Sequence, residues 1–186
     1  MRIEDLGLPG AKLIVPTYFE DPRGYSAEVF NADILKMNGI MEDFIMDYES
    51  FNRVEGTIRG IHFQNAPYAQ TKLVRVLTGR IKDYIIDLCQ ESSFYKKWVC
   101  VEISAKNREQ IYIPKGYGHA FVTCEPNTTI LYKLDGYYNA SAAKAVRWDD
   151  PEIGINWEVD NPVLSERDAH APWLSECDLI FDGVGD

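Results

Sequence analysis

Apolar and polar residues alternate with a period of two along most of the chain, in short runs separated by Gly, Asn or Asp. Alternation of this kind is typical of half-buried β-strands. It predicts strands at residues 12–15, 27–30, 44–51, 58–64, 72–77, 80–88, 98–104, 110–113, 119–123 and 128–134. Thr78-Gly79 separates two of these runs, which indicates a hairpin.

Helical patterns are few. Residues 32–38 suit a helix, because Asn31 can cap its start and Gly39 can end it. A short helix is also expected near residues 166–176. Many short strands with few helices predict an all-β fold, an antiparallel jelly-roll sandwich or barrel, formed by a single domain over residues 1–186.

The net charge of the chain argues against some classes of binding partner. The 186 residues carry 19 Lys and Arg against 29 Asp and Glu, a net charge of −10. A chain of this charge lacks the cationic face that nucleic acids and anionic membranes attract, so we expect neither partner. The start of the chain is acidic and no apolar stretch is long enough to span a bilayer, which favours a cytoplasmic protein.

Cysteine and histidine spacing argues against a metal centre. Cys89, Cys100, Cys124 and Cys177 match neither zinc-site spacing nor a disulfide framework, so we interpret them as reduced thiols, with Cys100 and Cys124 in strands. Metal-binding barrels of this kind often carry an H-x-H pair, but Gln64 stands where a second histidine would follow His62. The interpretation as a metal site therefore loses most of its support.

His62 is the first candidate for chemistry. Strict alternation along strand 58–64 puts His62 and Gln64 on one face and Arg59 on the other. A histidine and a glutamine on one face, beside a glycine, suggest the lining of a polar cavity. The alternative is a hydrogen-bonded structural histidine.

Four other candidates are ambiguous when taken singly. His119 follows a Pro- and Gly-rich turn that delivers it to the start of a strand. Lys72 opens an apolar strand and could equally be a solvated edge lysine. Tyr132 could be a core aromatic, and Asp168 could be a helix cap or a surface charge.

Several motifs follow one another in a fixed order. They are Phe19-x-Asp21-x-Arg23-Gly24-Tyr25-x-x-Glu28-x-Phe30; Arg59-Gly60-Ile61-His62-Phe63-Gln64; Lys72-Leu73-Val74-Arg75 with Gly79; Asn107 and Gln110 with Ile113-Pro114-Lys115-Gly116-Tyr117-Gly118-His119-Ala120-Phe121; Arg147-Trp148-Asp149-Asp150-Pro151; and Leu164-Ser165-Glu166-Arg167-Asp168. Over residues 10–175 this combination closely resembles the dTDP-4-dehydrorhamnose 3,5-epimerase family.

The resemblance implies a cofactor-free, cupin-type jelly roll that forms a homodimer. The implied reaction is epimerisation of a nucleotide-linked sugar, dTDP-4-dehydro-6-deoxy-D-glucose, at C3 and C5 to give dTDP-4-dehydro-L-rhamnose. Both carbons flank the C4 ketone, so each can lose a proton if the resulting enolate is stabilised. This chemistry needs a base, an acid on the opposite face and an electropositive group at the ketone oxygen.

The same resemblance implies catalytic roles. His62 would be the base, with Asp168 orienting its ring, and Tyr132 would return the proton from the other face. Lys72 would stabilise the enolate, and His119 would support this cluster by hydrogen bonding.

It also implies residues that bind the substrate: Phe19, Arg23, Glu28, Asn52, Arg59, Gln64, Tyr138 and Arg167. Guanidinium groups such as that of Arg59 suit the diphosphate. In the family, Arg23 reaches the site of the neighbouring subunit.

The chain also departs from the family pattern. Asp47-Tyr48-Glu49 stands where Gln-x-Asn is common, and an acidic residue is replaced near Ala143-Lys144. Three alternatives therefore stay open: an epimerase that inverts one centre or acts on a GDP- or CDP-linked sugar, a catalytically silent sugar-nucleotide-binding protein, and a metal-dependent oxygenase.

Overall fold

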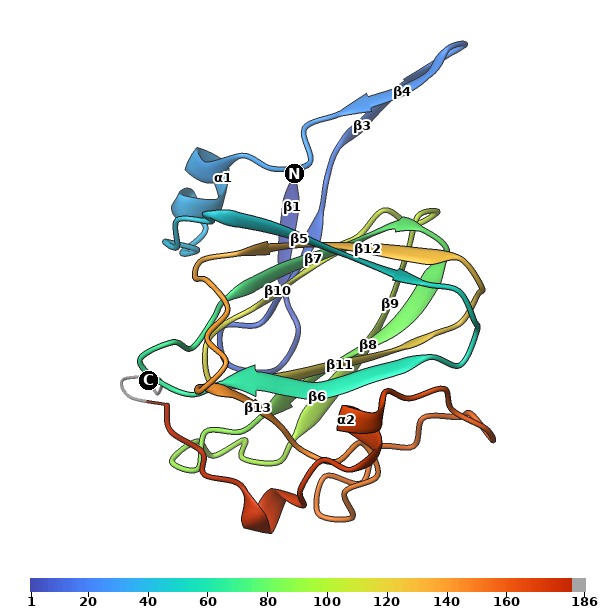
Figure 1. The fold of residues 1–186 in the computed structure, drawn as a ribbon. Coiled ribbons are helices and arrows are strands. Elements are labelled where there is room, and N and C mark those ends of the chain that lie inside the picture. Colours follow the sequence, from blue (N-terminus) through green and yellow to red (C-terminus); the bar gives the residue numbers. More distant parts are fainter. Residues whose placement is uncertain (182–186) are drawn as a thin grey trace.

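Two antiparallel sheets face each other in the computed structural model, which describes residues 1–181 (Figure 1). The six-stranded sheet has the order β1-β2-β10-β7-β12-β5. Its strands are β1 (Arg2–Asp5), β2 (Lys12–Val15), β10 (Gln110–Ile113), β7 (Lys72–Thr78), β12 (Thr128–Leu134) and β5 (Met46–Asn52).

The five-stranded sheet has the order β13-β6-β11-β8-β9. Its strands are β13 (Ala143–Ala145), β6 (Ile58–Gln64), β11 (Tyr117–Thr123), β8 (Arg80–Asp87) and β9 (Trp98–Ser104). Apart from the β1–β2 and β8–β9 pairs, neighbouring strands are non-consecutive in the chain, because the chain crosses between the sheets as in a jelly roll. The predicted all-β jelly-roll fold is confirmed.

The core between the sheets contains the inward side chains of both. Ile81 and Ile85 of β8 pack against Val74 and Val76 of β7 and Ile130 of β12, all buried. Alternation is what places them there, because every second side chain of a strand faces the other sheet.

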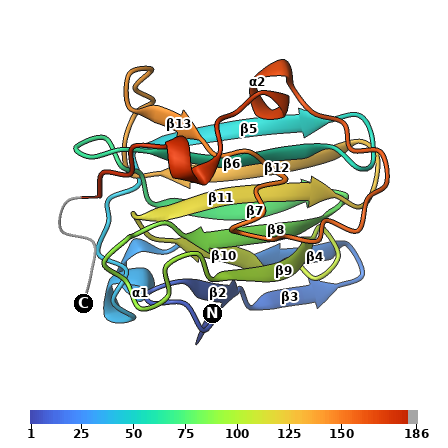
Figure 2. The ribbon, with the colours of Figure 1, turned by 90° about the horizontal axis from the view of Figure 1, so that it is seen from below.

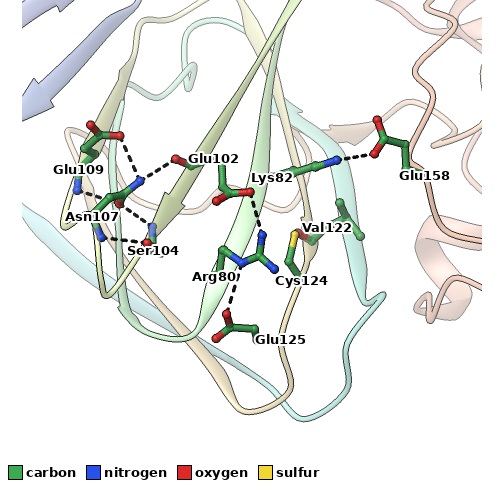
Figure 3. A network of polar contacts seen from close by, with 10 residues as sticks. All are labelled: Arg80, Lys82, Glu102, Ser104, Asn107, Glu109, Val122, Cys124, Glu125 and Glu158. Carbon is green, nitrogen blue, oxygen red and sulfur yellow. Dashed lines mark hydrogen bonds and ion pairs between the residues drawn. The ribbon is translucent and has the colours of Figure 1, made fainter.

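The outer face of the five-stranded sheet is covered only in part. A C-terminal segment lies across it and buries Trp157 and Leu174 against Tyr84 (Figure 2). Towards the strand ends the face is polar. There Arg80 forms ion pairs with Glu102 and Glu125, and the Lys82 ammonium pairs with Glu158 (Figure 3).

Helix α1 (Ala32–Met37) covers part of the outer face of the six-stranded sheet. The side chain of Asn31 accepts a hydrogen bond from Ile34 N at 3.1 Å, as the predicted cap requires. Leu35 is buried there against Ile14 and Leu73. Helix α1 therefore closes one end of this face.

Strands β3 (Tyr18–Asp21) and β4 (Gly24–Ala27) form a separate two-stranded sheet. Figure 1 shows this hairpin, which we call the arm, extending away from the two main sheets.

Several sequence predictions are wrong in detail. Residues 28–30 are not a strand, and β1, β3 and β13 were not predicted. The hairpin predicted across Thr78-Gly79 is not formed, because β7 and β8 lie in different sheets and the connection crosses from one sheet to the other. The helix expected over 166–176 is two pieces, α2 (Glu166–Ala169) and a 3₁₀ turn (Leu174–Glu176), because Pro172 between them cannot donate a helical hydrogen bond. Cys100 lies in β9, but Cys124 follows the end of β11.

Two further sequence expectations concern thiols and membranes. Cys100, Cys124 and Cys177 are thiols in the described part of the chain, as expected. Over residues 1–181, the helices are all too short or too polar to cross a bilayer.

Candidate active site

A cavity of about 530 Å³ opens between the two sheets. Most of the predicted site residues line it: Arg59, His62, Gln64, Lys72, His119, Tyr132, Tyr138 and Arg167. They come from four strands, from the segment after β12 and from α2. The fold therefore brings residues up to 108 positions apart, Arg59 and Arg167, to one cavity.

His62 and Asp168 form a pair at the cavity wall. His62 Nε2 lies 2.6 Å from Asp168 Oδ1, and the side chain of His62 is 37% exposed while that of Asp168 is 3% exposed. A carboxylate can only accept, so Nε2 carries the proton of a neutral ring and Nδ1 keeps a lone pair. The described residues make no hydrogen bond to Nδ1, which leaves it available as a base.

The N-terminus of α2 fixes Asp168. Ser165 caps this helix, and its hydroxyl accepts a hydrogen bond from Asp168 N at 3.1 Å. Burial raises the pKa of Asp168, but hydrogen bonds from His62, Ser165 and Gly60 N outweigh it and lower the pKa below its usual value. Asp168 is therefore a carboxylate, able to hold the His62 ring.

A β-bulge puts Arg59 on the same side as His62. His119 of β11 pairs with His62 and Phe121 pairs with Arg59, so two residues of β6 oppose only one of β11. Such an insertion reverses the alternation. The prediction that Arg59 and His62 face opposite ways is wrong for this reason, since both line the cavity.

A second buried pair lies deeper in the cavity. His119 Nε2 lies 2.8 Å from Asp83 Oδ2, and both side chains are almost fully buried. Burial lowers the pKa of His119 although Asp83 opposes this, so the ring is neutral. Burial also lowers the pKa of Lys72, to about 8, again against the attraction of Asp83. Lys72 is therefore mostly a cation at neutral pH.

Asp83 was missed by the sequence reasoning. Its Oδ1 is buried and has no hydrogen-bond partner within residues 1–181. The available signal was a carboxylate on the inward face of strand 80–88, among apolar residues. In residues 1–181, no three His, Cys, Asp or Glu side chains form a group that could hold a metal.

Tyr132 faces the cavity from the opposite sheet. It belongs to β12 of the six-stranded sheet, whereas His62 belongs to β6 of the five-stranded sheet. Burial raises the pKa of Tyr132, and the Ser50 hydroxyl opposes this in part. The Tyr132 ring is 5.8 Å from that of Tyr48, which also lines the cavity and was not predicted. Tyr132 is thus a protonated phenol opposite the His62–Asp168 pair.

Asn52 supports the cavity from behind. Its Oδ1 accepts a hydrogen bond from Arg59 Nε at 2.7 Å, and its Nδ2 donates to Thr128 O at 3.2 Å. Asn52 is 2% exposed and is not among the lining residues. The structure therefore places Asn52 where it positions Arg59.

Gln64 lines the cavity, but its amide is engaged with the rim. Its Nε2 donates to Tyr68 O at 2.8 Å and to Tyr137 O at 3.3 Å, and its Oε1 accepts from Asn139 N at 2.7 Å. This residue therefore holds the rim segment that carries Tyr138, which is 63% exposed.

The three residues predicted from the first motif lie outside this cavity. Phe19 is 67% exposed on β3, and Arg23 at the tip of the arm pairs with Asp21 at 2.6 Å. Glu28 lines a second cavity, of about 420 Å³, on the outer face of the six-stranded sheet. Within one chain, the predicted grouping of these residues with His62 is therefore not formed.

An antiparallel jelly roll whose cavity opposes a histidine–aspartate pair to a phenol, with a lysine near the buried Asp83, defines an acid–base enzyme. The family model of the dTDP-4-dehydrorhamnose 3,5-epimerases matches residues 5–176. The chain belongs to the dTDP-4-dehydrorhamnose 3,5-epimerase family, and is an isomerase with the cupin jelly-roll fold.

Individual relatives support the same family assignment. The dTDP-4-dehydrorhamnose 3,5-epimerase of Sinorhizobium fredii is 40% identical over 185 residues, 99% of this chain and 95% of that one. The crystal structure of the Bacillus anthracis enzyme with TDP and PPi bound is 40% identical, with a TM-score of 0.91 over 92% of this chain and 98% of that chain. The Legionella pneumophila epimerase in complex with dTDP-4-keto-L-rhamnose is 32% identical, with a TM-score of 0.90 over 95% and 94%.

Proposed function

We propose that this chain converts dTDP-4-dehydro-6-deoxy-D-glucose to dTDP-4-dehydro-L-rhamnose by inverting C3 and C5. One observation carries this proposal. A base, the His62–Asp168 pair, and an acid, Tyr132, enter one cavity from opposite sheets. Inversion requires a proton to leave one face of a carbon and another to arrive at the opposite face, which this arrangement provides.

His62 removes the proton. Its Nδ1 accepts hydrogen from the carbon next to the ketone, and the ring becomes an imidazolium. Asp168, 2.6 Å from Nε2, stabilises this charge and keeps the ring in orientation.

Lys72 stabilises the enolate. When the C–H bond breaks, its electron pair moves to the ketone oxygen, which gains negative charge. Lys72 is the cation of the deep part of the cavity, and a fixed charge in a water-poor site stabilises an oxyanion strongly. The His119 ring is hydrogen-bonded to Asp83, and it therefore holds that carboxylate near Lys72. The ketone oxygen of the substrate is then stabilised by the ammonium group of Lys72.

Tyr132 completes the inversion. Its hydroxyl donates a proton to the opposite face of the carbon, and the enolate collapses to the ketone. His62 then gives its proton to solvent and Tyr132 regains one, so the enzyme returns to its starting state. The same cycle at the second carbon gives the doubly inverted product.

Deuterium incorporation tests this function. The protein is incubated with dTDP-4-dehydro-6-deoxy-D-glucose in deuterated water, and C3 and C5 are followed by NMR. Deuterium at both carbons is the expected result. Incorporation at one carbon alone identifies a single-centre epimerase, and incorporation at neither contradicts the proposal and leaves a silent binding protein or another substrate.

Two variants separate the steps. His62→Ala should abolish deuterium incorporation, because the first proton is no longer removed. Tyr132→Phe should reduce product formation more than it reduces proton loss from the substrate. Exchange at the wild-type rate in His62→Ala would show that another group is the base.

We also propose that the active form is a homodimer. Arg23, Phe19 and Glu28 are motif residues that lie outside the cavity of their own chain. The arm that carries Phe19 and Arg23 projects from the body (Figure 1), so it is placed to reach a second copy. An Arg23 guanidinium supplied by the partner would bind the diphosphate there.

A further inference from the structure

One residue that lines the cavity follows, in the sequence, the range that the family model matches. That match ends at residue 176, whereas Phe181 lines the cavity. We propose that the segment Asp178–Phe181 is a specificity wall of the pocket, and that Phe181 contacts the nucleobase of a pyrimidine nucleoside diphosphate. This inference rests on the proposed function for the identity of the substrate.

Three hydrogen bonds attach the segment to the end of β6. Asn65 Nδ2 donates to Asp178 O at 2.9 Å, and Asn65 Oδ1 accepts from Ile180 N at 3.1 Å. Ala66 N donates to Ile180 O at 2.7 Å. Asn65 is 4% exposed, so its amide meets both demands in a buried position. The segment is therefore a fixed part of the site.

Phe181 adds an aromatic surface to this end of the cavity. Its ring centroid is 5.6 Å from that of Phe63, at an interplanar angle of 51°. Tyr138 and Ala143 line the cavity with them. Ala143 pairs with Gln64 across β13 and β6, which places this end of the cavity at the end of β6.

The positions of the catalytic residues and of Phe181 indicate which part of the nucleotide sugar lies at each end of the cavity. The keto sugar must lie at His62, Lys72 and Tyr132, because the chemistry occurs there. Asn65 follows His62 by three residues, which is about 10 Å along a strand. The diphosphate and ribose separate the sugar from the base, and the base is the part of the ligand with flat apolar faces. Phe181 is therefore suited to the base.

Binding of two probes tests the inference independently of catalysis. Calorimetry with dTDP and with inorganic pyrophosphate is carried out on the wild-type protein and on Phe181→Ala. We expect the Kd for dTDP to rise roughly threefold to tenfold, which is the usual size of one aromatic contact. The Kd for pyrophosphate, which has no base, should stay the same.

Controls make each outcome decisive. Phe94→Ala removes a phenylalanine that is 37% exposed outside the cavity lining, and it should leave both Kd values unchanged. If the melting temperature of Phe181→Ala lies well below that of the wild type, the Phe181→Leu variant is measured in its place. We expect a smaller rise in the Kd for dTDP in that variant. An unchanged Kd for dTDP, or an equal loss for both probes, would overturn the inference. A protein that binds dTDP through Phe181 but exchanges no deuterium would contradict the proposed function alone.

Discussion

The protonation state of Lys72 predicts how the activity depends on pH. Burial lowers its pKa to about 8, so it is protonated at neutral pH and loses its charge as the pH rises through that value. In the proposed mechanism this cation stabilises the enolate, so kcat should fall about tenfold per pH unit on the alkaline side. A pH profile of kcat, measured with saturating substrate, checks this.

The matched variant is Lys72→Arg. A guanidinium keeps its charge far above pH 8, so the alkaline fall should disappear even though the different shape of the group lowers kcat. If Lys72→Arg kept the same alkaline fall as wild type, a group other than Lys72 would control it.

Asp168 provides a second prediction at this scale. Asp168→Asn keeps the shape of the side chain but removes the charge that, in the proposed mechanism, stabilises the His62 imidazolium. We therefore expect kcat to fall roughly 10²- to 10⁴-fold. Steady-state kinetics and deuterium exchange should fall together. Asp149→Asn removes a carboxylate that pairs with Arg147 at the surface and should leave kcat unchanged, whereas near-normal kcat in Asp168→Asn would contradict the pairing role.

At the scale of elements, Gly60 is the residue that lets β6 approach β11 at the bulge. Its φ is +138°, and a Cβ there would lie 2.2 Å from the Cβ and 2.6 Å from the Cα of Ala120. Gly60→Ala should therefore destabilise the protein by roughly 2–4 kcal/mol, measured by urea unfolding. In contrast, Gly136→Ala would meet only Gln70 Cγ at 3.7 Å and should stay within about 1 kcal/mol of wild type. Equal stabilities of the two variants would show that the bulge tolerates a side chain.

The same bulge shows which features of the fold could be predicted from the sequence and which could not. Alternation located most strands, because one face of each is buried and the pattern records that burial. It failed for β3, since a hairpin outside the main sheets buries neither face fully, and it assigned Arg59 to the wrong face because an inserted residue is invisible to a period of two. His62, Lys72, Tyr132 and Asp168 were predicted from the family resemblance, whereas Asp83 and Phe181 required contacts across the fold.

For the whole molecule, net charge and site charge differ in sign. The chain carries −10 overall, yet Arg59, Lys72, Lys144 and Arg167 line the cavity. A small anion responds to the few charges around it more than to the distant sum, because water and salt screen the surface. The acidic exterior is thus compatible with a diphosphate ligand.

Arg108, in the loop between β9 and β10, attaches the arm to the body. A two-stranded hairpin is marginal by itself. The Arg108 guanidinium lies 4.6 Å from the ring centre of Tyr18 and 4.0 Å from that of Tyr25, and it also pairs with Glu20 at 3.1 Å. This cation–π contact fixes the base of the arm. The side chain of Arg23 at the tip is exposed, and Figure 1 shows the arm extending away from the two main sheets.

Subunit mixing tests whether the arm acts in a second copy. His62→Ala and Arg23→Ala proteins, each weak or inactive alone, are unfolded together and refolded. If Arg23 serves the partner's cavity, a mixed dimer contains one site with both residues intact and one with neither. Random pairing makes half of the dimers mixed, so about a quarter of wild-type activity should return. If each cavity used its own Arg23, every site would keep one defect and the mixture would stay as inactive as its components, which would exclude an arm that completes the neighbouring site.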